Sequence, residues 1–62
     1  MRLIEFQTTG RHGSIVYVNP EQVEFIKRES DAAVQLFFYS GSMLFVLGSM
    51  ESVREKLLDD KA

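Results

Sequence analysis

The stretch "LFFYSGSMLFVLGS", residues 36–49, decides the fold because it predicts a β-hairpin whose strands are almost entirely apolar. Ser40 and Gly41 interrupt the apolar run, and glycine is favoured in the short turns that join antiparallel strands. We expect strands at about 33–39 and 43–47 on the two sides of this turn. A two-residue turn could consist of residues 40–41 or 41–42, and the two resulting registers differ by two residues. Because side chains alternate with a period of two, both registers place the same side chains on the same face.

Both faces of this hairpin are expected to be apolar, whereas an antiparallel sheet commonly packs one face and exposes the other to water. The first predicted face consists of Val34, Leu36, Phe38, Met43, Phe45 and Leu47. The second face has a single polar member and consists of Gln35, Phe37, Tyr39, Leu44 and Val46. The hairpin therefore needs a cover on each side.

The sequence before the hairpin predicts three more strands, at about 2–8, 14–18 and 23–29. Alternation in the first of them places Ile4 and Phe6 inward. Asn19 and Pro20 separate the second strand from the third, because proline cannot donate to a ladder and asparagine can bond its own backbone. We expect a tight turn or a single 3₁₀ turn at that point.

The sequence after the hairpin predicts one helix, at about 50–60. Ser49 suits its N-cap, and an apolar stripe follows, formed by Met50, Val53, Leu57 and Leu58. The outer face carries Arg54, Glu55 and Lys56, and fraying is expected at Asp59 and Asp60, which oppose the helix dipole. The prediction is a single α+β domain over residues 1–62, an antiparallel five-stranded β-meander with one C-terminal helix.

One helix covers only one face of such a sheet, so the second face of the hairpin is left exposed. We expect it to form an interface between copies of the chain, a dimer or a higher homo-oligomer, through Phe25, Phe37, Tyr39, Leu44 and Val46. The alternative is that the strands curl into a closed barrel whose interior takes both faces.

The size of the chain favours association. A chain of 62 residues buries little more apolar surface than is needed to offset its conformational entropy, and domains of this size commonly depend on disulfides, metals or oligomerisation. The sequence contains no cysteine, so a disulfide is excluded. Self-association is the stabilising device that remains.

Residues for catalysis or metal binding are few. The single histidine, His12, lies beside Arg11 in a glycine-containing loop that matches no phosphate-binding spacing. The acidic candidates Glu5, Glu21, Glu24 and Glu29 are not spaced to meet in a pocket and are expected on solvated strand faces. We therefore expect no enzyme activity, no catalytic residue, no metal and no cofactor.

Charge and hydropathy restrict the other partners. The net charge of −2 gives no basic bias, so nucleic acid is an unlikely partner. The alternative hypothesis is a single-stranded nucleic-acid-binding β-module, in which aromatic rings on the sheet stack bases between Arg2, Arg11, Lys27 and Arg28. No apolar run of about 18 residues predicts a membrane span, and the N-terminus does not read as a signal peptide. A cytoplasmic location is expected.

The order of these features resembles the small FlbD-like (SwrD-type) proteins encoded among bacterial flagellar and motility genes. The matching features are Asn19 with Pro20, the run 23–26, the turn at Ser40 and Gly41, and Ser49 with Val53. Phe25, Phe37, Tyr39, Met43 and Leu44 depart from the family, which usually carries polar or basic residues at these positions. The resemblance implies a non-catalytic accessory protein associated with motility, with a protein partner that the sequence does not identify.

Overall fold

The computed structural model describes residues 2–58 and contains five strands, one 3₁₀ turn and one helix. In chain order these are β1 (Ile4–Gln7), β2 (Ile15–Val18), η1 (Pro20–Gln22), β3 (Val23–Ser30), β4 (Ala33–Phe38), β5 (Met43–Leu47) and α1 (Met50–Leu58). Every predicted strand and the helix are present, with ends that shift by a few residues. The fraying expected at Asp59 and Asp60 lies outside the described residues.

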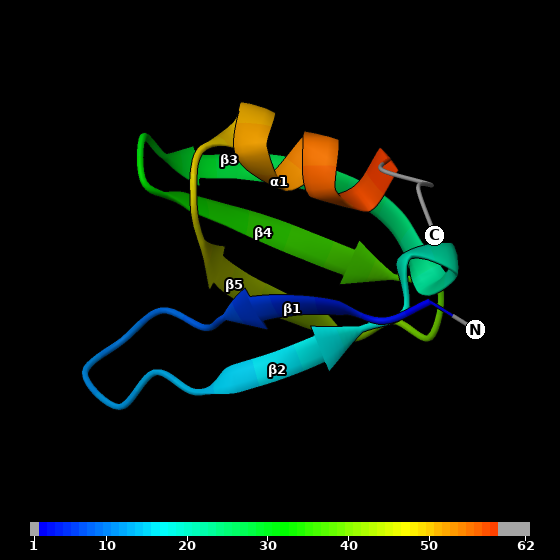
Figure 1. Ribbon diagram of the computed structural model, residues 1–62, viewed down its shortest axis with the longest axis horizontal. Helices are drawn as coiled ribbons and strands as arrows, with labels where there is room; N and C mark the ends of the chain where they lie inside the picture. The colour runs from blue at the N-terminus through cyan, green and yellow to red at the C-terminus, as the bar shows by residue number, and fades with distance from the viewer. Residues whose placement is uncertain (1, 59–62) are drawn as a thin grey trace.

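The strands form two antiparallel sheets, so the expected single five-stranded meander is wrong (Figure 1). One sheet is the hairpin of β1 and β2, and the other has the order β3-β4-β5. The break falls at η1, where Pro20 has no N–H and Asn19 Oδ1 accepts a hydrogen bond of 3.0 Å from the Glu21 N–H. This capped 3₁₀ turn, one of the two kinds of turn that were expected, carries the chain from the first sheet to the second.

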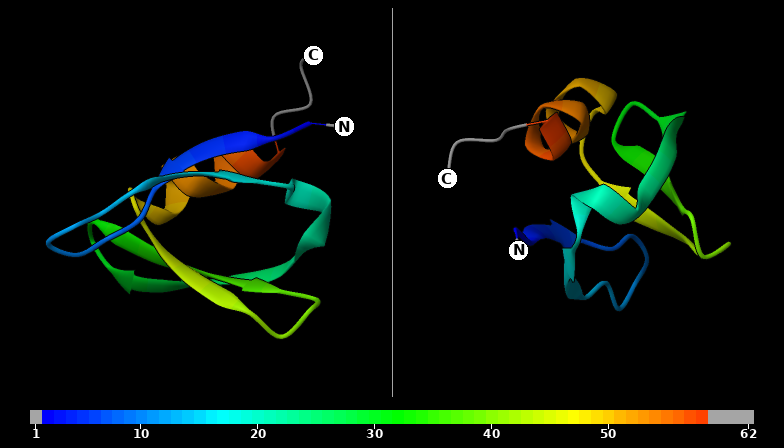
Figure 2. Two further views of the ribbon diagram at one scale, coloured as in Figure 1. Left: turned by 90° about the horizontal axis from the view of Figure 1, so that it is seen from below. Right: turned by 90° about the vertical axis from the view of Figure 1, so that its right-hand side faces the viewer.

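A single bridge connects the two sheets near the end of β1. Thr8 pairs with Val46 of β5, and the Thr9 N–H donates to the Phe45 carbonyl at 3.1 Å. Figure 2 shows the two sheets facing each other, with α1 along one open side of the stack. The layers enclose one apolar core that consists of Ile4, Phe6, Val18, Val34, Leu36, Val46 and Val53. The expected inward orientation of Ile4 and Phe6 is confirmed.

The register of the β4–β5 hairpin differs from the expected one by one residue. Leu36 pairs with Leu44 and Phe37 with Met43, so the connection is a three-residue turn, 39–41, in place of a two-residue turn. The Gly41 N–H donates to the Phe38 carbonyl at 2.9 Å, and Gly41 has a φ of 96°. A glycine in the left-handed region at the end of the loop is typical of three-residue hairpins.

This one-residue shift moves every side chain of β5 to the opposite face. Leu44 and Val46 point into the core together with Val34 and Leu36. The alternate residues of β5 point outward, and these are Met43, Phe45 and Leu47. The two predicted faces of the hairpin therefore had their β5 members exchanged.

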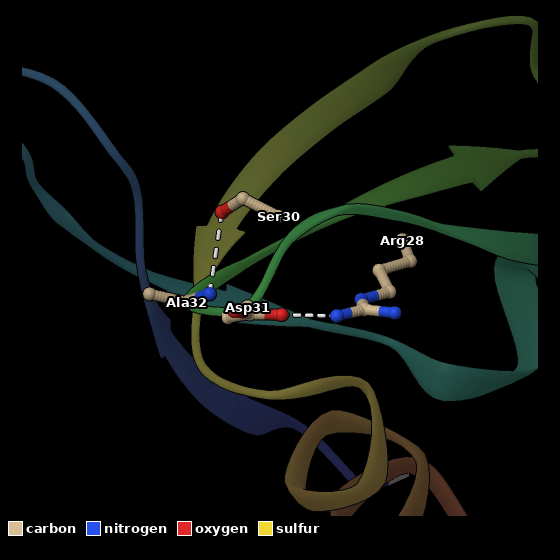
Figure 3. Close-up of polar contacts among 4 residues, drawn as sticks. All are labelled: Arg28, Ser30, Asp31 and Ala32. Atoms are coloured by element: carbon tan, nitrogen blue, oxygen red, sulfur yellow. Dashed lines mark hydrogen bonds and ion pairs between the residues drawn. The ribbon is translucent and has the colours of Figure 1, made fainter.

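The turn between β3 and β4 is held by polar contacts (Figure 3). Ser30 Oγ accepts a hydrogen bond of 3.2 Å from the Ala32 N–H, and the Arg28 guanidinium forms an ion pair with Asp31. The Ala32 carbonyl also accepts from the Gly48 N–H at 2.8 Å. This last bond fixes the entry to α1 beside the β3–β4 turn.

Helix α1 begins as predicted, with Ser49 Oγ accepting from the Ser52 N–H at 3.1 Å. Val53 is fully buried, and Met50 and Leu57 pack against the core. Leu58 is 67% exposed, so its assignment to the buried stripe was wrong. Consecutive helical residues point about 100° apart, and with Leu57 turned inward Leu58 is carried away from the core. Within residues 2–58, no helix is long and apolar enough to cross a membrane.

Candidate interaction surface

The side of the three-stranded sheet that faces away from the core carries a cluster of large apolar side chains. We call this surface the outer face and define it by Phe25, Phe37, Met43, Phe45 and Leu47. Strand alternation places them there, because their neighbours Val34, Leu36 and Val46 are fully buried on the opposite side. The β1–β2 sheet and α1 pack on the other side of β4 (Figure 2). They leave the outer face open except at its edge, where Leu47 lines a pocket with Ile15 and Lys56.

Phe25 reaches the outer face because a bulge interrupts the alternation of β3. Val23 pairs with Phe38 and Phe25 with Phe37, so Glu24 is the extra residue in the register. The bulge leaves both Val23 and Ile26 packed against the core and turns Phe25 outward. An exposed phenylalanine between two core residues is thereby explained by the backbone.

The rings of Phe25 and Phe37 stack on each other across the two strands, with centroids 4.4 Å apart and planes 13° apart. Phe25 remains 50% exposed, Met43 46% and Leu47 45%. Because a large apolar side chain has an area of about 150–250 Å² and these three fractions sum to about 1.4, the three side chains expose roughly 200–350 Å² of apolar surface. Phe37 and Phe45, which are partly exposed, add to this area. An apolar patch of this size is within the range that often has a function in monomeric proteins.

Polar groups on the outer face are few. Gln35 lies in the middle of β4, and its Nε2 donates to the Met43 Sδ at 3.2 Å. Lys27 pairs with Gln35 across the β3–β4 ladder and is exposed. The face is therefore an apolar surface with one amide at its centre and one cation at its β3 side.

The predicted interface residues divide into two groups. Phe25 and Phe37 lie on the outer face, and Tyr39 lies in the adjoining 39–41 turn, where it is 65% exposed. Leu44 packs against the core and Val46 is 0% exposed, so neither belongs to an exposed surface. Leu44 and Val46 lie on the buried side because of the change of register, which the three-residue turn ending at Gly41 produces.

Sequence reasoning missed Met43, Phe45 and Leu47 as members of the outer face. The signal that could have identified them was the spacing of the turn, because glycine at the third loop position favours a three-residue connection. The closed barrel considered from the sequence also required both faces of the hairpin to lie inside. The structure places only one of its faces there.

The second sheet exposes apolar side chains in a different pattern. Ile15 is 53% exposed and Tyr17 63%, but each pairs across the strands with a polar residue of β1, Gln7 and Glu5 respectively. This is the ordinary mixed surface of a half-buried hairpin. Its apolar residues alternate with polar ones, and Ile15 meets the outer face at the pocket that it shares with Leu47.

The candidate chemical groups lie apart from one another. Arg11 and His12 are exposed in the loop between β1 and β2. The four acidic candidates from the sequence are all exposed and are distributed over three elements, with Glu5 in β1, Glu21 in η1, and Glu24 and Glu29 in β3. Within residues 2–58, no group of three or more acidic or histidine side chains is placed to hold a metal ion.

Comparison with known proteins adds no relative. No family model matches the chain, and no curated protein or solved structure matches it either.

Proposed function

We propose that this protein is a small, non-catalytic interaction protein that associates with copies of itself through the outer face. The observation that supports this proposal is the placement of Phe25, Phe37, Met43, Phe45 and Leu47 together on one uncovered sheet surface. Exposing this surface to water costs free energy, and contact with a second apolar face recovers it.

A two-fold arrangement suits this surface, because each copy offers the same apolar cluster to the other. Both copies together remove roughly 400–700 Å² of apolar area if Phe25, Met43 and Leu47 become buried, and the remaining residues of the face and its polar rim add to the interface. This is smaller than the roughly 1,200–2,000 Å² of a standard stable interface. We therefore propose an equilibrium between monomer and dimer at micromolar concentrations.

Binding of single-stranded nucleic acid is the second candidate function, because the Phe25 ring is half exposed and Lys27 lies on the same sheet face. Stacking on aromatic rings beside cations is the usual mode of such binding. The aliphatic Met43 and Leu47 and the net charge of −2 favour a protein partner. The resemblance to FlbD-like proteins supports an accessory role in motility, with self-association as one part of that role.

Sedimentation of the full chain over a range of micromolar concentrations tests the first candidate. A mass that rises with concentration supports it, and a strictly monomeric species rejects it. Titration of a labelled single-stranded oligonucleotide at two salt concentrations tests the second, because phosphate contacts produce a steep dependence of affinity on salt.

A further inference from the structure

The free edge of β3 is separate from the self-association surface. β3 is the terminal strand of its sheet, and within residues 2–58 its outer edge has no hydrogen-bonded strand. Pairing with β4 is regular from Phe25 to Arg28, between two register shifts. The N–H and C=O groups at a free edge can pair with an added strand.

A groove between this edge and α1 lies beside the same segment. It has a volume of about 230 Å³. Among the residues that the structure describes, its apolar lining consists of Pro20, Val23, Phe25, Ile26, Leu57 and Leu58, and Arg54 is the charged residue of the lining. Pockets for small organic ligands are usually larger, about 300–1,000 Å³. The groove is therefore suited to one or two side chains of a larger partner.

Two features of the groove are not explained by the fold. Leu58 is 67% exposed at the end of α1, where it contributes little to the core. Arg54 is exposed and forms no ion pair with any of residues 2–58. The ion pair found within those residues joins Arg28 and Asp31. A guanidinium binds a carboxylate through two parallel hydrogen bonds. The groove therefore combines an apolar surface with a cation that complements an acidic group.

We propose that the groove and the free edge of β3 together bind an extended, acidic-apolar peptide segment of a partner protein as an added strand. The peptide backbone pairs with β3 between Phe25 and Arg28, as in other cases of strand addition. One apolar side chain of the peptide enters the groove against Ile26 and Leu57. A neighbouring carboxylate pairs with Arg54, which sets the preference for acidic sequences.

Selection from a phage-displayed library of random decapeptides on the immobilised full chain tests this proposal. The expected result is enrichment of sequences in which an apolar residue stands next to Asp or Glu. Arg54→Glu should reverse the preference of the selected peptides from acidic to basic residues. Leu58→Glu should raise the dissociation constant of an enriched synthetic peptide by about tenfold or more, which corresponds to about 1.4 kcal/mol. Arg11→Glu, the same charge reversal at an exposed arginine in the β1–β2 loop, should leave both results unchanged.

The position of the peptide has its own readout. Amide hydrogen exchange in the Phe25–Arg28 segment should slow when the enriched peptide is added, because an added strand occupies the free edge. No enrichment, or enrichment that Arg54→Glu leaves unchanged, would overturn the proposal. So would unaltered exchange along β3.

The result is separable from self-association. Met43→Glu alters the outer face and should reduce self-association while peptide binding persists. Arg54→Glu should leave the sedimentation of the chain unchanged. If it abolishes association instead, the groove is occupied by a second copy of this chain and the proposal of a foreign peptide is wrong. Phe25 belongs to both surfaces and is unsuitable as a test of either.

Discussion

The ring of Phe25 lies on the ring of Phe37 across the β3–β4 ladder, with 4.4 Å between their centroids and 13° between their planes. The stack exists because the bulge at Glu24 turns Phe25 to the side of the sheet that carries Phe37. Cross-strand aromatic pairs stabilise a sheet through contact of the side chains themselves. The pair thus connects the register of β3 with the composition of the outer face.

A double-mutant cycle on this pair should show coupling. Phe25→Leu and Phe37→Leu remove the ring contact while keeping an apolar side chain at each position. We expect a coupling energy of about 0.5–1.5 kcal/mol in the free energy of unfolding. Urea unfolding of the four proteins at a concentration where the chain is monomeric measures it. Additive effects would mean that the rings do not stabilise the folded chain.

A charge on the outer face should disrupt self-association. Met43 is 46% exposed, so Met43→Glu leaves the monomer folded but places a carboxylate inside the proposed interface. We expect the dissociation constant to rise by about tenfold or more, which corresponds to at least about 1.4 kcal/mol. Sedimentation equilibrium measures it.

Leu3→Glu is the matched control for this experiment. Leu3 is 52% exposed directly before β1, so the same charge is introduced at a similarly exposed apolar position away from the outer face. Self-association should not change in this variant. A loss of association with Leu3→Glu but not with Met43→Glu would move the interface to the start of β1.

Most of the secondary structure could be predicted from the sequence, because its signals are local. Alternation predicts β1, the Asn19–Pro20 pair predicts η1, and Ser49 predicts the start of α1. The division into two sheets could not be predicted in this way. It depends on whether β2 pairs with β3 after the 3₁₀ turn, which is a question of tertiary geometry.

The outer face could be predicted in part. An excess of apolar residues in the hairpin indicated an uncovered face, and Phe25 and Phe37 are on it. Leu44 and Val46 were assigned to the wrong side because side-chain orientation in a strand reverses with a shift of one residue. A turn of three residues instead of two is a small change in the loop, and it exchanged the β5 residues of the predicted face.

Gly41 should be the residue that fixes this register. Its φ of 96° lies in a region that residues with a Cβ rarely adopt, and no atom lies within 4 Å of the position that a Cβ would occupy. Gly41→Ala should therefore lower the free energy of unfolding by about 1 kcal/mol through backbone strain alone. Asn tolerates this conformation better, so Gly41→Asn should cost less. Equal stability of the Ala variant and the parent chain in urea would contradict the three-residue turn.

Lys56 should stabilise the contact between α1 and β1 although it is exposed. Its amine donates to the Glu5 carbonyl and lies 4.3 Å from the centroid of the Phe6 ring. We expect Lys56→Met to lower the free energy of unfolding by about 1 kcal/mol, because methionine has neither a charge nor an N–H donor and both contacts are lost. Lys27→Met is the control and should change stability by less than about 0.5 kcal/mol. Thermal unfolding that does not distinguish the two variants would show that the amine adds nothing.

Val53 should be the residue through which α1 is held on the sheets. It is 1% exposed and belongs to the same core as Val34 and Val46, so Val53→Ala leaves a cavity that the close-packed layers fill only in part. We expect a loss of about 1–3 kcal/mol in the free energy of unfolding, measured in urea. Leu58→Ala removes more side-chain volume from the same helix but at a position that is 67% exposed, and it should cost less than about 0.5 kcal/mol. If Leu58→Ala proves the more costly of the two, the buried side of α1 is rotated toward Leu58, and the groove beside β3 closes with it.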